Sequence, residues 1–231
     1  MYDVAIIGGG VVGCAIAREL SKYKLRLCLL EKGEDVAVGA SKGNSGIVHG
    51  GYAAKYGTLK GKLCLKGNQS FQSLDQELNF GFRRPGALVI GFDEQDEKTI
   101  KGLYENGLKM GCDDLEIIGA ERIREIEPYI NPEVKVALYA KSVGVASPYE
   151  MTVALAENAI ENGLHLKLSR EVLSIEKLPQ GFRLITEEEQ VESRYVINAA
   201  GLYSDVVAKM VGADNFSIIP RRGQYVLLGK D

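Results

Sequence analysis

The sequence has few of the residues that build metal or disulfide sites. Its four cysteines (Cys14, Cys28, Cys64 and Cys112) are scattered, no two of them form a C-x-x-C pair, and no pair of histidines lies near them. This pattern indicates free thiols in a reducing compartment and argues against a zinc or iron–sulfur site. We therefore expect a cytoplasmic protein, with peripheral contact to a membrane left open.

Long apolar runs and an excess of positive charge are also missing. No stretch approaches the roughly 18 apolar residues that a membrane span needs, so we expect no transmembrane segment. The net charge of −3 and the lack of a basic stripe argue against nucleic acid as a partner. Residues 1–7 already read as a strand, so we expect no signal peptide. The 231 residues fit one or two globular domains.

The first 31 residues carry the pattern of a dinucleotide-binding unit. "YDVAIIG" predicts a buried strand, "VVGCAIARELSKY" has apolar residues at helical spacing, and "LRLCLLE" predicts a second buried strand. Gly8, Gly10 and Gly13 lie between strand and helix, where glycines allow a tight turn and a close approach of a pyrophosphate to the helix N-terminus. Glu31 ends the second strand, where a carboxylate can accept hydrogen bonds from a ribose. A glycine-rich turn without a ligand is the alternative.

The middle of the chain distinguishes between FAD and NAD. Residues 170–192 predict a small β-meander, and the strand that follows ends in "NAAG". An antiparallel meander as a crossover is typical of two-domain flavoprotein folds, whereas an NAD domain joins its strands by helices. Glu31 also argues against a 2′-phosphate at this site, and hence against NADPH. The predicted cofactor is FAD.

Helix and strand signals continue through the rest of the chain. Asp93 can cap a helix over about 95–110 that Gly111 ends, and Ser147 with Glu150 forms a capping box for the next long helix. We further expect helices over 58–79, 119–127 and 204–211, and strands over 86–92, 134–140, 164–169, 171–178, 182–188, 190–201 and 216–229.

The segment "VGASKGNSGIVHGGY", residues 38–52, stands out by its five glycines and two serines. It is too poor in apolar side chains for the core, and it follows the predicted nucleotide site directly. Small side chains let a backbone run close to a bulky ligand. The segment contains His49, one of two histidines in the chain. The other, His165, falls in an alternating strand, and we expect it to be structural.

Four stretches in order along the chain resemble a known family. They are "DVAIIGGGVVGCAIARELS", "GNSGIVHGGYAAKYGTLKGKLC", "VINAAGLYSD" and "PRRGQYVLL". Together they are similar to the D-amino-acid-oxidase-like FAD-dependent oxidoreductases, in particular to the L-2-hydroxyglutarate dehydrogenase/oxidase and glycerol-3-phosphate dehydrogenase branch. The resemblance implies an α/β fold: a Rossmann-type FAD-binding domain with a β-meander crossover, plus a partial antiparallel α+β substrate domain. We expect the FAD-binding domain over 1–80 and 144–215, and the substrate domain over 81–143 and 216–231.

The resemblance also implies which residues hold the cofactor. Gly8, Gly10 and Gly13 would contact the pyrophosphate, and Glu31 the adenosine ribose. By the same resemblance, Ser41, Asn44, Ser45 and Gly46 pass the pyrophosphate and the flavin, the Val172 backbone meets the adenine, and Ala199, Ala200 and Gly201 close over the phosphates.

Two further residues are candidates for the chemistry. His49 matches a segment that leads to the flavin face, and an imidazole suits removal of a hydroxyl proton near neutral pH. Packing without chemistry and covalent attachment of the flavin are the alternatives for His49. Arg222, or Arg221 beside it, is the predicted clamp for a carboxylate or phosphate, with a salt-bridged surface role as the alternative. Tyr52 and Tyr225 could lend hydroxyls to the substrate or pack in the core.

Three functions are compatible with this sequence. The leading hypothesis is FAD-linked oxidation of the CH–OH group of a small anionic 2-hydroxy acid, similar to L-2-hydroxyglutarate, by hydride transfer to flavin. The second is oxidation of sn-glycerol 3-phosphate in the same fold. Both require an electron acceptor, namely a quinone, oxygen or a redox protein. The third is a flavin-binding electron-transfer module without its own substrate. Chains of the family continue past "YVLL", so we expect residues 1–231 alone to bind FAD weakly or not at all.

Overall fold

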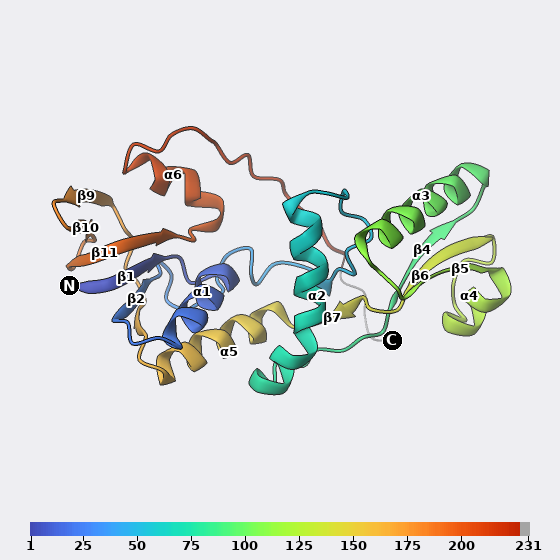
Figure 1. Ribbon diagram of the computed structural model, residues 1–231, viewed down its shortest axis with the longest axis horizontal. Helices are drawn as coiled ribbons and strands as arrows, with labels where there is room; N and C mark the ends of the chain where they lie inside the picture. Colours follow the sequence, from blue (N-terminus) through green and yellow to red (C-terminus); the bar gives the residue numbers. More distant parts are fainter. Residues whose placement is uncertain (227–231) are drawn as a thin grey trace. The chain divides into compact units, whose positions relative to one another are not determined.

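The computed structural model describes residues 1–226, which form two compact units. Unit 1 comprises Met1–Asn44 together with the chain from Thr152 onward, and unit 2 comprises Ser45–Met151. Figure 1 labels the helices and strands of both units. The boundaries of these two units follow from how densely the chain packs, and they do not define functional domains. The functional domain boundaries expected above, after residues 80, 143 and 215, stay a prediction.

A six-stranded sheet forms the centre of unit 1, in the order β8-β2-β1-β11-β10-β9. Four neighbouring strands are parallel, and β10 runs antiparallel to both β9 and β11. The meander β9–β10–β11 therefore returns the chain to the edge of β1, as the sequence predicts, and the α/β fold is confirmed. The strands are β1 (Tyr2–Ile7), β2 (Leu27–Leu30), β8 (His165–Lys167), β9 (Ser174–Leu178), β10 (Gly181–Ile185) and β11 (Gln190–Asn198).

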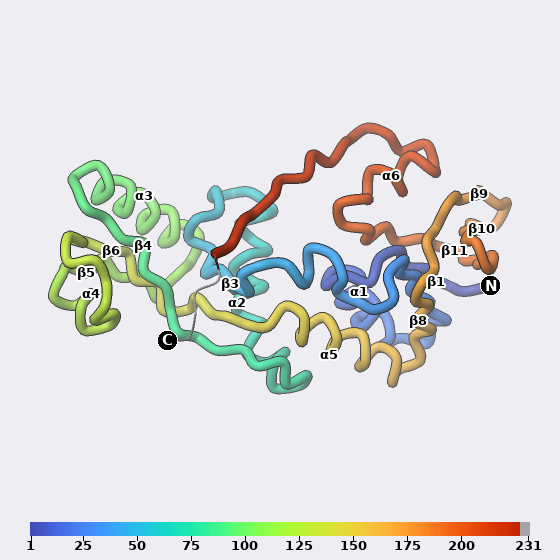
Figure 2. Tube along the Cα trace, turned by 180° about the vertical axis from the view of Figure 1, so that it is seen from behind, coloured from blue at the N-terminus to red at the C-terminus, as the bar shows by residue number. Residues whose placement is uncertain are grey.

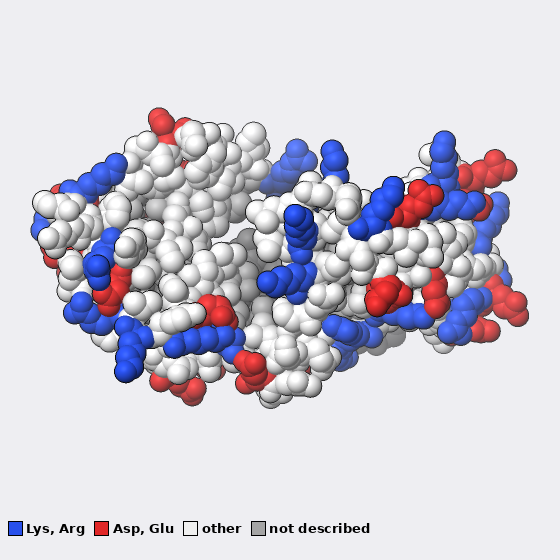
Figure 3. All heavy atoms as spheres, in the orientation of Figure 1, with Lys and Arg blue, Asp and Glu red and all other residues white. Residues whose placement is uncertain are grey.

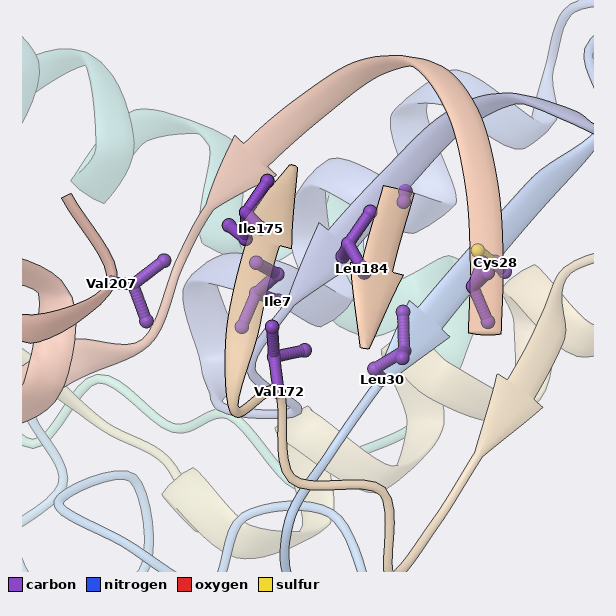
Figure 4. Packing of buried hydrophobic residues seen from close by; sticks show 9 residues of the cluster. Ile7, Cys28, Leu30, Val172, Ile175, Leu184 and Val207 are labelled. Atoms are coloured by element: carbon purple, nitrogen blue, oxygen red, sulfur yellow. The ribbon is translucent and has the colours of Figure 1, made fainter. Parts of the chain in front are cut away.

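Both faces of β1 and β2 are covered, which explains why these two strands read as continuous apolar runs. On one face, side chains from β1, β2, β9, β10 and α6 (Ser204–Lys209) meet in a cluster that includes Ile7, Leu30 and Val172 (Figure 4). The alternate residues Ile6 and Leu29 are fully buried as well, and they point to the opposite face. Helix α1 (Val11–Ser21) packs against β1 and β2.

Unit 2 contains an antiparallel sheet in the order β4-β6-β5. Helix α3 packs on Leu138 and Ala140 of β6, whereas α4 packs on Ala137 of the same strand. Because successive residues of a strand point to opposite faces, the two helices cover opposite sides of the sheet, as Figure 1 shows. The elements are β4 (Ala87–Gly91), α3 (Glu94–Met110), β5 (Leu115–Gly119), α4 (Ala120–Ile126) and β6 (Val136–Ala140).

Strand β5 was not predicted from the sequence. It buries Leu115 and Ile118, which lie three residues apart and so do not show the period of two that marks a half-buried strand. A two-stranded ladder of β3 (Ile47–Val48) and β7 (Gly144–Val145) was also missed. It is too short for any periodic signal. Helix α2 (Leu59–Leu78) lies between β3 and β4 in the chain and was predicted.

The predicted caps at Asp93, Gly111 and Ser147 are confirmed. The Asp93 side chain accepts a hydrogen bond from the Asp96 N–H at 2.9 Å, and Gly111 ends α3 with a positive φ of 90°. The Glu150 N–H donates to Ser147 Oγ at 3.2 Å at the start of α5 (Pro148–Glu161). Each cap supplies a partner for a helix-end group that has none within the helix.

The strand predicted over 216–229 is wrong for its described part. Residues 213–226 contain no helix or strand, and Figure 2 shows them as an extended trace after α6. Residues 227–229 lie outside the described residues. A strand needs a neighbour to pair its backbone, and no strand among residues 1–226 lies beside this segment. A side chain of α6 tethers this segment: Asp205 Oδ2 accepts a hydrogen bond from the Ile218 N–H at 3.1 Å.

Charged side chains of both signs are interspersed over the face drawn in Figure 3. Several are paired on the meander and beside it: Lys167 Nζ lies 2.8 Å from Glu189 Oε2, and Arg183 Nη2 lies 2.9 Å from Glu192 Oε1. The Arg183–Glu192 pair joins the neighbouring strands β10 and β11. Such pairs add little stability, because exposed ion pairs contribute about 0.2–1 kcal/mol.

Candidate functional site

The turn between β1 and α1 is closed by backbone against backbone. A Cβ atom on Gly13 would lie 1.9 Å from the Gly8 carbonyl oxygen, and one on Gly8 would lie 2.4 Å from the Ala199 carbonyl oxygen. Gly8 also has a φ of +108°, which other residues rarely adopt. The glycines are therefore required by close packing of the turn on the helix and on the end of β11.

Glu31 holds the turn from the neighbouring strand. Its Oε2 accepts from the Gly9 N–H at 2.6 Å, and its Oε1 accepts from the Gly33 N–H at 2.8 Å. The side chain is buried. Because a carboxylate offers about four acceptor positions, these two bonds leave capacity for a ribose hydroxyl. The structural role of Glu31 was not predicted.

The N-terminus of α1 is arranged as an anion site. Gly10 is its N-cap and has no side chain, and the first turn carries no acidic residue. Ser41 Oγ accepts from the Val11 N–H at 2.9 Å, so the loop that follows β2 supplies the missing cap. The remaining N–H groups of the first turn have no intrahelical partner and carry the positive end of the helix dipole. A Cβ on Gly10 would lie 3.1 Å from Ser41 Oγ, in the space between turn and loop.

A cavity of about 340 Å³ opens at this turn, lined entirely by residues of unit 1. The structure places most of the predicted cofactor residues in its wall. Gly13 and Asn44 do not line the cavity. Gly13 packs against the Gly8 carbonyl oxygen, and Asn44 Nδ2 donates to the Ala40 and Ser41 carbonyl oxygens. The predicted residues that line the cavity are Gly8, Gly10, Glu31, Ser41, Val172, Ala199, Ala200 and Gly201.

Other lining residues were missed. Lys32 and Tyr203 lie on the wall, with Lys32 Nζ 3.5 Å from the centre of the Tyr203 ring. Arg170 and Met210 also contribute. Lys32 follows Glu31 in the sequence and could have been suspected. Tyr203 lies in the stretch "VINAAGLYSD", two residues after Gly201, and could have been suspected as well. No sequence signal marks Met210, because the fold alone brings it to this cavity.

This cavity fits the adenosine diphosphate part of a dinucleotide. Glycines leave room at the helix N-terminus, where phosphates bind, and the Glu31 carboxylate suits a ribose. Ile7, Leu30 and Val207 form an apolar wall, as an adenine ring requires. The groups that would contact the ligand are held by the protein itself: Glu31 by the Gly9 N–H and Ser41 by the Val11 N–H.

The thiols of Cys14 and Cys28 are buried and unreactive. Burial raises the pKa of Cys14 to about 12, helped by the negative charge of Glu31, and burial raises the pKa of Cys28 to about 12. The Cys14 thiol donates to the Gly9 carbonyl oxygen at 3.4 Å. Since the thiolate is the nucleophile, neither residue is suited to covalent chemistry.

The other predicted loop residues belong to unit 2. Gly46 has a φ of +66°, and a Cβ there would lie 2.3 Å from the Ala146 carbonyl oxygen. Ser45 is exposed. The His49 side chain is exposed, while the backbone around it is held by Asn68. The sequence did not indicate a role for Asn68.

The remaining candidates have the following environments. Arg222 and Arg221 lie exposed in the segment after α6. Tyr52 packs against the core of unit 2, and burial raises the pKa of its phenol. Tyr225 is exposed. His165 Nδ1 lies 2.9 Å from the Tyr2 hydroxyl, which agrees with a structural role.

The sheet with its meander crossover and the cavity at the glycine turn define a dinucleotide-binding flavoprotein unit. The chain belongs to the DAO family of FAD-dependent oxidoreductases, whose family profile matches residues 3–231. FAD is the cofactor of this family, in agreement with the prediction. None of the described helices is long and apolar enough to cross a membrane.

Named relatives cover the whole chain. A glycerol 3-phosphate dehydrogenase of Caloramator mitchellensis is 52% identical over 100% of this chain and 48% of its own length. A glycerol 3-phosphate oxidase of Mycoplasma pneumoniae is 34% identical, covering 98% and 61%. Human mitochondrial L-2-hydroxyglutarate dehydrogenase is 30% identical, covering 98% and 52%. The chain thus spans about half the length of the curated relatives it matches.

Solved structures show the same fold. The dithionite-reduced L-α-glycerophosphate oxidase of Mycoplasma pneumoniae with FAD bound superposes with a TM-score of 0.86 at 30% identity, over 90% of this chain and 56% of that one. A glycine oxidase of Geobacillus kaustophilus superposes with a TM-score of 0.85 at 26% identity, over 91% and 58%.

Proposed function

We propose that the protein to which this chain belongs oxidises glycerol 3-phosphate with FAD. The observation that carries this proposal is the 52% identity to a glycerol 3-phosphate dehydrogenase across the whole chain. The L-2-hydroxyglutarate dehydrogenases are 30–32% identical over a similar span. Glycerol 3-phosphate therefore replaces the 2-hydroxy acid as the first substrate to test.

In this proposal, the cavity of unit 1 holds the adenosine diphosphate half of FAD. Gly8, Gly10 and the first turn of α1 contact the pyrophosphate, and Glu31 contacts the ribose. Ala199 and Gly201 close over the phosphates from the end of β11. When bound, FAD accepts a hydride from the carbinol carbon of the substrate.

We assign His49 the removal of the hydroxyl proton and Arg222 the binding of the substrate phosphate. An exposed imidazole on a fixed backbone can reach a substrate hydroxyl, and a guanidinium engages a phosphate through two parallel hydrogen bonds. Both assignments rest on the residue types and on the family resemblance.

Anaerobic mixing of the flavin-loaded protein with each candidate substrate tests the proposed function. We expect glycerol 3-phosphate to bleach the flavin absorbance at a rate no slower than kcat. L-2-hydroxyglutarate should leave the absorbance unchanged. The reverse result would restore the 2-hydroxy acid. If neither compound bleaches the flavin while a reduced redox protein does, the protein is an electron-transfer module.

His49→Ala tests the proton acceptor. We expect kcat for glycerol 3-phosphate to fall by about 10²–10⁴-fold, which is the usual contribution of a general base. The matched control is His165→Gln, which removes the other histidine at a site remote in sequence and should leave kcat unchanged. An unchanged kcat in His49→Ala would reduce His49 to a packing residue.

A further inference from the structure

Asn68 is a buried polar residue of α2 whose side chain joins two other segments. Its exposed fraction is 3%. The amide nitrogen Nδ2 lies 2.9 Å from the Ser142 carbonyl oxygen and 3.2 Å from the His49 carbonyl oxygen, with the Val48 oxygen at 3.5 Å. An amide has two N–H groups, so the two shorter bonds use both, and the third is a shared contact.

These bonds form where the β3–β7 ladder ends. Val48 pairs with Gly144 in the last register position of this ladder, and His49 is the first residue beyond it. A buried carbonyl oxygen without a hydrogen bond is costly. The Asn68 amide supplies the N–H groups that the ladder no longer provides, and it thereby ties both diverging segments to α2.

Neighbouring contacts hold each end of this arrangement. The Ser142 N–H donates to Asp114 Oδ2, and Arg84 Nη2 donates to the Asn68 carbonyl oxygen at 3.3 Å. Cys112 Sγ donates to the Gly50 carbonyl oxygen at 3.3 Å. The backbone before and after His49 is therefore fixed, although the His49 side chain itself is exposed.

We propose that Asn68 is a positioning residue, which fixes the backbone of His49 so that its imidazole meets the substrate hydroxyl in one geometry. This inference rests on the proposed function, in which His49 accepts the proton. A misplacement of a reacting group by about 1 Å can cost about 10²-fold in rate. Asn68 acts through His49 and need not touch the substrate.

Asn68→Ala in the flavin-loaded protein is the kinetic test. We expect kcat for glycerol 3-phosphate to fall about 10–100-fold, while KM and the flavin content stay within about threefold, because the variant shifts the base and leaves the binding groups in place. The matched control is Ile123→Val, which trims a buried side chain of the same unit away from His49. It should change neither kcat nor KM.

Histidine ring signals in NMR spectra give a readout that does not need activity. The chain has two histidines. The His49→Ala spectrum assigns the ring signals of His49, because those signals are missing from it, and the His165→Gln spectrum assigns those of His165 in the same way. We expect Asn68→Ala to shift or multiply the His49 ring signals and to leave those of His165 in place. Ile123→Val should leave both sets unchanged.

The outcomes separate this inference from the proposed function. His49 signals identical to those of the wild type, or an unchanged kcat despite shifted signals, would overturn the positioning role. If the wild-type protein does not oxidise glycerol 3-phosphate, the proposed function fails, and shifted signals would still show that Asn68 holds His49. Should Asn68→Ala not fold, Asn68→Ser is measured in the same two ways, because its shorter side chain keeps a polar donor at this position but cannot reach both carbonyl oxygens.

Discussion

Two glycine-rich segments, residues 8–13 and 43–51, each contain four glycines and are held in place in part by different means. In the first, Gly8 and Gly13 face backbone atoms, and a Cβ there would lie 2.4 and 1.9 Å from carbonyl oxygens. In the second, Gly46 also faces a backbone carbonyl oxygen, whereas a Cβ on Gly43 would meet no atom within 4 Å and one on Gly50 would meet the Ser142 Oγ at 3.0 Å. The backbone beside Gly50 is held by a side chain, that of Asn68.

The difference shows how each segment can be disrupted. Backbone atoms of packed strands and helices cannot move aside, so the first segment tolerates no added carbon at these glycines. Side chains can rotate, so the second segment tolerates small additions at Gly43 and Gly50, though not at Gly46, which faces the Ala146 carbonyl oxygen. It depends instead on particular hydrogen-bond donors. The following changes separate the two cases, beginning with the largest expected effect.

Gly13→Ala should be the most disruptive change. The added Cβ would overlap the Gly8 carbonyl oxygen. Overpacking costs about 1–3 kcal/mol, and more where the surrounding backbone cannot shift. We expect the melting temperature to fall sharply and flavin binding to be lost, as measured by thermal unfolding and by flavin absorbance after purification.

Gly43→Ala is the matched control for that substitution. Its Cβ enters open space, and its conformation does not require glycine, so stability should change by less than about 1 kcal/mol and can rise. Equal losses in the two variants would show that the glycine turn is not special.

Glu31→Gln should have the next largest effect. The amide nitrogen cannot accept a hydrogen bond, so the Gly9 or Gly33 N–H loses its partner. Leaving a buried donor unsatisfied costs about 1–3 kcal/mol. Denaturant unfolding measures the loss, and flavin titration measures the weaker affinity. Glu34→Gln, at an exposed position three residues away, should change neither quantity.

Gly50→Ala should cost about 1 kcal/mol, because a contact of 3.0 Å with a hydroxyl can be relieved by rotation. Combining it with Ser142→Ala removes that hydroxyl and should restore most of the stability. A double variant no more stable than Gly50→Ala alone would point to Val143, whose Cγ2 lies 3.2 Å from the same position.

Each glycine-rich segment has a cysteine beside it, Cys14 at Gly9 and Cys64 at His49. The reactivity of these two thiols should differ. With a pKa of about 12, Cys14 carries about 10⁻⁴ of its thiol as thiolate at pH 8. Cys64, half-buried beside the His49 carbonyl oxygen, is the accessible thiol among the four. With a disulfide reagent at pH 8, Cys64→Ser should remove one equivalent of fast-reacting thiol, and Cys14→Ser should remove none. Loss of a fast equivalent in Cys14→Ser would contradict this.

Much of the fold followed from local pattern. Continuous apolar runs marked β1 and β2 because both of their faces are covered, and the caps at Asp93 and Ser147 formed as expected. Strand β5 escaped because it buries residues three apart. The strand expected near the end of the chain did not form over its described residues, since strand pairing depends on a partner and not on alternation alone.

The sequence by itself determined the dinucleotide turn, because glycines at fixed spacing mark it. It also determined the choice of FAD and the family, because the meander, Glu31 and the four resembling stretches can be read from the order of residues. The tertiary structure alone decided that Glu31 clamps the turn, that Ser41 caps α1, and that Asn68 holds His49. Each of these contacts joins residues at least 19 positions apart or on different elements. Their spacing carries no period, so only the folded chain reveals which donor meets which acceptor.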